Sequence, residues 1–150
     1  MSSKNFTCLV CNGSTFDILT RMFSEYTNSL FDEYSEYQTF FDVVVFRHVL
    51  EHMTNPSEAF LKLRTFMKPE ALLYIALPNA AQPSVNKGFR TSFLRPVHIS
   101  YFCSGNVLRL ADTVKLKPIA TEEDDEIFCL LTTGKVDSTQ VDYYLSQKNF

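Results

Sequence analysis

The chain has 150 residues, of which 45% are hydrophobic and 21% charged, and its formal net charge is -3. This length suffices for one core without disulfides, and the hydrophobic content argues against a disordered chain. The negative net charge excludes the strongly basic surface typical of nucleic-acid-binding proteins. No apolar run reaches the roughly 18 residues that span a membrane, and the first residues are polar, so we expect neither a membrane span nor a signal peptide. Four cysteines without a regular framework suit a reducing compartment, so we predict a cytoplasmic protein.

The N-terminal region, residues 1–40, contains a Cys-x-x-Cys pair, Cys8 and Cys11, followed by Asn-Gly-Ser. This pattern is typical of the first knuckle of a zinc ribbon. A structural zinc takes four ligands in a tetrahedral array, and the stretch from Arg21 to Thr39 offers no Cys or His. We therefore predict a degenerate zinc-ribbon-like segment with an incomplete ligand set, which is either a relict hairpin or a site shared with another chain.

A strand and a helix are predicted at the start of the segment 41–79. Val43–Phe46 is a short apolar run, β-branched and too brief for a helix, as expected of a buried parallel strand. From Pro56 onward, apolar residues recur at helical spacing. Asn55 or Thr54 is expected to cap this helix, because either side chain can accept a backbone hydrogen bond in its first turn.

The helix is predicted to end at Lys68-Pro69, since the residue before proline is disfavoured in the α region. A second buried strand follows at residues 72–77 and leads to Asn79. A second helix is predicted over residues 104–112, with Ser104 as a plausible cap. Two further strands are expected around an acidic turn, at residues 115–120 and 127–133.

Polar residues directly follow the first predicted strand, and three of them, His48, Glu51 and His52, form the pattern H-x-x-E-H. In some hydrolases, this pattern places two histidines one helical turn apart on zinc while the glutamate activates water. It requires a long helix, whereas here it follows a strand and is ended by the helix start at Asn55. A zinc hydrolase is therefore a remote alternative, and the structural alternative is that Glu51 and His52 form a local hydrogen-bonded cap.

The order of these elements resembles the second half of a class I S-adenosylmethionine-dependent methyltransferase domain. The resemblance rests on a strand ending in FRHVLEH, a helix, a Lys-Pro turn, a strand ending in LPN, and HISYF before the next helix. It covers residues 41–135 and leaves 136–150 as a tail. It implies an α/β fold with a truncated Rossmann-like sheet of parallel strands, finished by an antiparallel hairpin. The family often has two glycines after the Lys-Pro, where this chain has Glu70-Ala71.

The resemblance implies methyl transfer from S-adenosylmethionine to a small-molecule acceptor. The cofactor would lie where α/β folds bind ligands, at the strand exits, and the residues implied there are Phe46, Arg47, His48 and Asn79. His48 or His98 would be the base that takes a proton from the acceptor. The structural alternatives are that His98 bonds a backbone carbonyl and that Asn79 closes the turn.

The glycine-rich turn that holds the cofactor in this family has no counterpart in the sequence. The chain has four glycines, and none lies within a few residues of another: Gly13, Gly88, Gly105 and Gly134. A close backbone approach to a ligand usually needs glycine. The alternative function is therefore a catalytically inactive remnant that acts as a binding or oligomerisation module. Because an unpaired central strand would aggregate, we expect the Phe41 strand to be covered by residues 14–40, by a partner chain or by a second copy in a homodimer.

Overall fold

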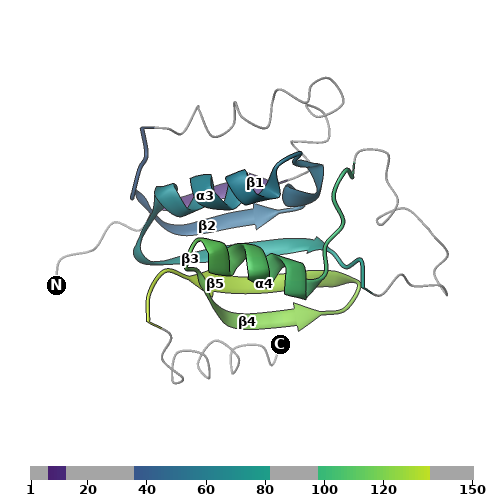
Figure 1. Cartoon of the computed structure of the whole chain (residues 1–150). Helices are drawn as coiled ribbons and strands as arrows, with labels where there is room; N and C mark the ends of the chain where they lie inside the picture. The colour runs from purple at the N-terminus through teal and green to yellow at the C-terminus, as the bar shows by residue number, and fades with distance from the viewer. Residues whose placement is uncertain (1–6, 13–35, 82–97, 136–150) are drawn as a thin grey trace.

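The computed structural model describes residues 7–12, 36–81 and 98–135 (Figure 1). These residues form an α/β fold with one sheet and two helices. Both helices lie on the same face of the sheet, side by side in Figure 1. The division into an N-terminal segment, a central domain and a tail is only partly covered by these residues, since the predicted tail 136–150 lies outside them.

Five strands form the sheet in the order β1-β2-β3-β5-β4. The first three run parallel, β5 is antiparallel to β3, and β4 is antiparallel to β5. This arrangement confirms the predicted Rossmann-like sheet with a terminal antiparallel hairpin. The strands are β1 (Cys8–Asn12), β2 (Phe41–Arg47), β3 (Met67–Pro78), β4 (Lys117–Glu123) and β5 (Glu126–Thr132).

β1 corrects the prediction for the N-terminal region. Cys8–Asn12 pairs in parallel with β2, so that Cys8 lies opposite Val43 and Asn12 opposite Arg47. The exposed edge of the Phe41 strand is therefore paired within the chain, by a short strand upstream of the segment 14–40. A second copy is not needed to cover that strand, and a homodimer stays a prediction.

β3 begins at Met67 and not at residue 72 as predicted, because Lys68 and Pro69 form part of the strand and not a turn before it. Phe41 pairs with Met67, and the register then shifts so that Val43 pairs with Leu72. Glu70, within the extra loop of chain, has a φ of 64°, in the left-handed region. Glycine adopts this conformation without strain, so Glu70 holds a backbone conformation that glycine would favour.

The first helix, α3 (Pro56–Phe66), begins as predicted, because the side chain of Asn55 accepts a hydrogen bond from the backbone N–H of Glu58 at 3.2 Å. The second, α4 (Ser104–Thr113), is preceded by Cys103 rather than capped by Ser104. Their buried side chains pack on the sheet around a core that includes Phe46 of β2. The buried residues of the two helices are Ala59, Phe60, Leu63, Phe66, Val107 and Ala111.

Asp42 joins the amino-terminal ends of three strands. Its Oδ2 accepts hydrogen bonds from the backbone N–H of Thr7 at 2.9 Å, from the Thr7 hydroxyl at 2.8 Å and from Lys68 Nζ at 2.8 Å. Thr7 immediately precedes β1, and Lys68 lies in β3. Lys68, followed by Thr7, lowers the pKa of Asp42 to about 2. The carboxylate is thus the shared acceptor that fixes the register of β1 on β2.

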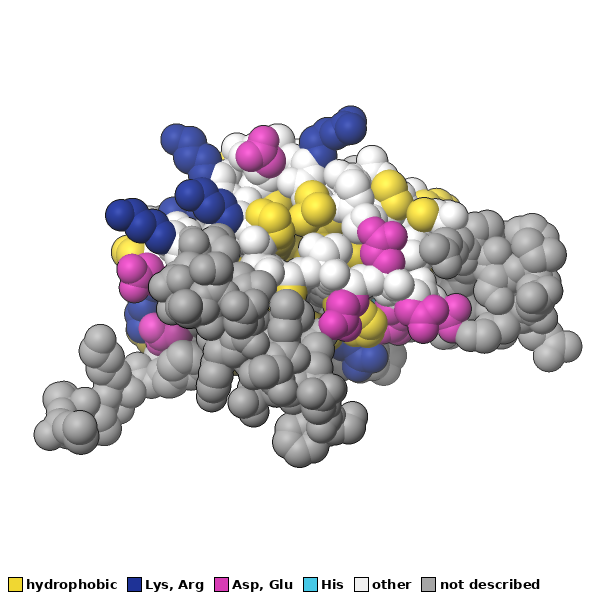
Figure 2. Space-filling view, turned by 90° about the horizontal axis from the view of Figure 1, so that it is seen from below, with side chains coloured by type: hydrophobic (Ala, Val, Ile, Leu, Met, Phe, Trp, Pro, Cys, Tyr) yellow, Lys and Arg dark blue, Asp and Glu magenta, His cyan; other side chains and the backbone are white. Residues whose placement is uncertain are grey.

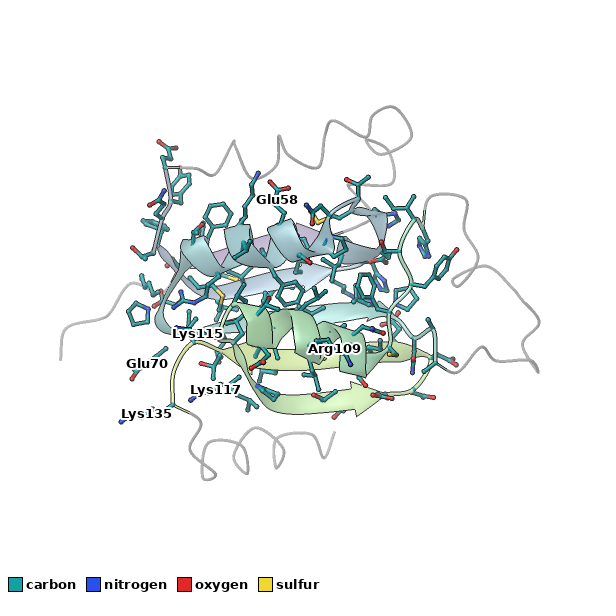
Figure 3. All side chains as sticks on the ribbon, viewed as in Figure 1. Glu58, Glu70, Arg109, Lys115, Lys117 and Lys135 are labelled. Carbon is teal, nitrogen blue, oxygen red and sulfur yellow. The ribbon has the colours of Figure 1, made fainter. Side chains whose placement is uncertain are left out.

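Charge is unevenly distributed along the sheet. In the view from below, most Lys and Arg side chains lie toward one end and a row of Asp and Glu side chains toward the other (Figure 2). Glu70, Lys115, Lys117 and Lys135 gather at the end where β3 begins (Figure 3). The exposed acidic turn between β4 and β5 lies at the end where β3 finishes, since Pro78 pairs with Glu126. Among the described residues no helix is long and apolar enough to cross a membrane.

Candidate functional site

The carboxyl ends of β1, β2 and β3 meet at one edge of the sheet, because the three strands are parallel. β2 ends at Arg47, and His48 then turns the chain with a φ of 51°. The turn leads into η1 (Leu50–His52), a single turn of 3-10 helix whose three residues are buried. The His48 backbone N–H still donates to Ala76 O of β3 at 2.9 Å. The backbone conformation of His48 therefore aims its side chain along this edge.

His48 lies between two carboxylates. Its Nδ1 is 3.4 Å from Glu51 Oε1, and its Nε2 is 3.1 Å from Glu126 Oε1. The Glu51 carboxylate is the main cause that raises the pKa of His48 above its ordinary value; burial opposes the rise and Glu126 adds to it. The side chain is 27% exposed, so it is held in place yet remains accessible. Arg47 is more exposed, with Nη2 4.0 Å from Glu126 Oε2.

The other two residues implied at the cofactor crevice are buried. Phe46 is fully buried in the core between the sheet and the helices. Asn79 is also buried, and its amide is used by the surrounding loops: Nδ2 donates to Asp124 O at 3.0 Å, and Oδ1 accepts from the Ala81 N–H at 2.9 Å. This arrangement matches the structural alternative, in which Asn79 closes the turn. A contact of either side chain with a cofactor stays a prediction.

His98 joins the same edge from a distant part of the sequence. The backbone N–H groups of Ile99 and Ser100 both donate to Glu51 O at 3.0 Å, which holds this segment against η1. The rings of His52 and His98 meet edge to face with their centroids 4.9 Å apart. His98 is buried. The structure thus brings His48 and His98 to one cluster through Glu51, although only His48 is accessible.

The cluster of Glu51, His52 and His98 is the main feature that sequence reasoning missed. One carboxylate oxygen and one nitrogen of each imidazole all lie within 4.8 Å of one another. Neither Glu51 oxygen has a hydrogen-bond partner among the described residues, so the Glu51 carboxylate forms no local hydrogen-bonded cap there. The signal in the sequence was the pair of polar motifs that follow the two buried strands, but His98 lies 46 positions after His52.

The H-x-x-E-H hydrolase pattern does not have the geometry that its chemistry requires. His48 lies outside any helix and η1 spans only three residues. The two histidines are therefore not one turn apart on a long helix. This corrects the alternative of a zinc hydrolase built on His48 and His52.

The zinc knuckle expected at Cys8 and Cys11 is not supported either. Both cysteines lie in β1, where residues three apart point to opposite faces of the sheet. Cys8 is exposed and Cys11 is buried, and burial raises the pKa of the Cys11 thiol to about 11. Two thiols on opposite faces of one strand do not meet at a single ion.

A groove of about 430 Å³ lies on the helical face, between the start of α3, residues 100–102 and α4. Arg109 of α4 lines it (Figure 3). No residue implied in methyl transfer lines this groove, so it is separate from the edge described above.

A family model described as a methyltransferase domain matches residues 5–119. The chain belongs to this family. The match includes β1, so the methyltransferase domain extends upstream of the segment 41–135 that the sequence predicts. A search of curated proteins finds no match.

Solved structures place the methyltransferase domain in the expected fold at low sequence identity. A SAM-dependent methyltransferase from Aquifex aeolicus aligns with a TM-score of 0.54 and 10% identity, covering 88% of this chain and 85% of that one. The CurJ carbon methyltransferase aligns at 0.55 and 10%, covering 90% of this chain and 50% of that one. A SAM-dependent methyltransferase from Thermotoga maritima aligns at 0.50 and 11%, covering 64% and 57%. This chain therefore spans about half the length of the latter two methyltransferases.

Proposed function

We propose that this methyltransferase domain transfers the methyl group of S-adenosylmethionine to a small-molecule acceptor at the carboxyl ends of β1 and β2. Membership of the family supports the reaction. The observation that carries the location is the accessible His48, turned out of β2 in a left-handed conformation and held between two carboxylates. In open α/β sheets, ligands bind outside the carboxyl ends of the strands.

The described residues fit one wall of a cofactor crevice. β1 and β2 run parallel with their last residues in register, so both strand exits open at one edge. Arg47 is exposed there and His48 is partly exposed. His48 and Arg47 would therefore be the described side chains that contact the cofactor or acceptor.

The chemistry makes modest demands on the protein. S-adenosylmethionine supplies an already activated methyl group when bound. The chain must align the acceptor and accept its proton. The carboxylates around His48 raise its pKa, which strengthens it as a proton acceptor. Of the two candidate bases, His48 is favoured over His98 because the latter is buried against His52.

A second candidate function is a binding module without activity. Two of the four residues implied at the crevice, Phe46 and Asn79, are buried in structural roles. In a domain that has kept the sheet and lost the cofactor contacts, we expect such residues to be buried in structural roles.

Titration calorimetry with S-adenosylmethionine and S-adenosylhomocysteine separates the two candidates. We expect micromolar binding by the full chain, and a loss of about tenfold in affinity, or about 1.4 kcal/mol, for His48→Gln. Lys117→Gln is the matched control, because Lys117 lies at the opposite end of the sheet (Figure 3), and its affinity should equal that of the wild type. An absence of binding heat at high protein concentration would rule out the autonomous methyltransferase and leave the binding module.

A further inference from the structure

We propose that Glu51, His52 and His98 bind a divalent transition-metal ion at the exit of β2, with Zn²⁺ as the ion whose preferences they fit. One carboxylate and two imidazoles are a ligand set found in protein zinc sites, with water or another group in the remaining position. The same donors suit other first-row divalent ions, whereas Mg²⁺ and Ca²⁺ prefer oxygen ligands alone. The site does not depend on methyl transfer and is expected in the protein without S-adenosylmethionine.

The ligand atoms are already gathered. Glu51, His52 and His98 each offer one atom, and the three lie within 4.8 Å of one another. The shortest distance known within this set is 3.9 Å, between Glu51 Oε1 and His52 Nε2. Tetrahedral ligands at zinc-ligand bond lengths of about 2.0–2.2 Å stand roughly 3.4 Å apart. Small side-chain rotations would therefore complete the coordination.

The Glu51 carboxylate provides the second, independent observation. Glu51 is only 2% exposed, and neither of its oxygens has a hydrogen-bond partner among the described residues. An ionised carboxylate buried without compensation is costly, so such groups are normally paired or coordinate metals. His48 Nδ1 approaches Glu51 Oε1 to 3.4 Å from the accessible side. A bound cation would add the close polar partner that neither Glu51 oxygen has among the described residues.

The fold fixes the ligands from two separate segments. Glu51 and His52 are held by η1, and His98 is held by the segment whose next two backbone N–H groups donate to Glu51 O. The hydroxyl of Ser100 adds a bond to Met53 O at 3.4 Å. These contacts place the imidazoles of His52 and His98 against each other. This ligand set differs from that of the hydrolase pattern, whose two zinc-binding histidines would be His48 and His52. Here the two histidines are His52 and His98.

The site lies inside the protein, since all three ligands are buried. A bound ion would join η1 to the segment that begins at His98. Exchange with solvent should therefore be slow, and removal should require a strong chelator together with partial unfolding.

Calorimetric titration of the metal-free full chain with Zn²⁺ tests the proposal. We expect one ion per chain, and at least a hundredfold loss of affinity for both Glu51→Gln and His98→Gln. Glu123→Gln is the matched control, because it removes one exposed carboxylate from the same end of the sheet and should change the affinity less than threefold. Cys8→Ser, which removes the exposed thiol, should also bind normally.

Two results would overturn the site: no stoichiometric Zn²⁺ binding by the wild type, or equal Zn²⁺ affinity of Glu51→Gln and the wild type. A loss of Zn²⁺ binding in Cys8→Ser would also contradict it, because the ion would then be bound by a thiol. If Glu51→Gln fails to fold, X-ray absorption at the zinc edge of the wild type decides instead. A shell of nitrogen and oxygen with two imidazoles supports the site, and a sulfur ligand at about 2.3 Å contradicts it. Because no arm uses S-adenosylmethionine, failure here is separate from failure of the methyltransferase proposal.

Discussion

Two glycines give the clearest residue-scale prediction, because the space around them differs. A Cβ built on Gly134 would lie 3.1 Å from the Cα of Glu70, whereas one on Gly105 would meet nothing within 4 Å. Gly105 lies in α4, where alanine is favoured over glycine by about 1 kcal/mol. Glu70 is itself held in the left-handed region, so it cannot easily move away from a new methyl group.

We expect Gly105→Ala to raise the free energy of unfolding by about 0.5–1 kcal/mol and Gly134→Ala to lower it by about 1–3 kcal/mol. Urea denaturation at constant slope measures both. Equal effects of the two substitutions would show that the contact between Gly134 and Glu70 is not tight.

Also for single residues, the sequence predicted correctly that His48 directly follows a buried strand, which is the position where α/β folds bind ligands. Its role in a site stays a prediction. The sequence did not reveal that His98 joins Glu51 and His52, because that contact depends on how the loop after β3 returns to η1. Periodicity describes contacts within an element, and this one crosses between elements. Phe46 was predicted to lie at the cofactor crevice but is buried in the core, while its neighbour Arg47 is exposed. The sequence does not show at which residue of the strand burial ends.

At the scale of elements, the clamp around Asp42 predicts a pH dependence of stability. The pKa of Asp42 is lowered to about 2 in the folded chain, compared with about 3.9 in an unfolded one. The ionised carboxylate therefore stabilises the fold fully above the unfolded value, and this contribution is lost as the pH falls through the folded value.

Asp42→Asn should consequently be less stable than the wild type at neutral pH, and the difference should shrink between about pH 4 and pH 2. Unfolding midpoints in urea across this range measure the change. A difference that stays constant from neutral pH to pH 2 would mean that the charge of Asp42 does not stabilise β1 and β3.

The elements themselves were predicted to very different degrees. β2, α3, β3, α4 and the final hairpin follow from apolar runs, helical spacing and a proline, all of which are local signals. β1 was missed because Cys8–Asn12 is only five residues long and its two cysteines suggested a zinc knuckle. There are 28 residues between the end of β1 at Asn12 and the start of β2 at Phe41, and no local pattern reports a parallel contact over that distance.

For the whole molecule, β1 is the strand that covers the edge of β2, so its removal should change the state of association. Deleting residues 1–12 would leave the backbone groups of β2 unpaired along one side, and such edges pair with other chains. We expect this deletion to form oligomers or aggregates. Deleting residues 1–6, which keeps β1 intact, is the control and should behave as the full chain does. Size-exclusion chromatography with light scattering distinguishes the two, and a monomeric, folded product of the longer deletion would refute the role given to β1.

The position of β5 in the sheet has a consequence for how the chain can fold as it is made. β5 is the last of the described strands in the sequence, yet it lies between β3 and β4. A nascent chain that has reached β4 has no partner for that strand, and β3 still exposes its hydrogen-bonding groups on one side. The sheet can close only when residue 132 has left the ribosome, so this domain should complete its fold after, rather than during, synthesis of its strands. Until then, one side of β3 stays unpaired in the nascent chain.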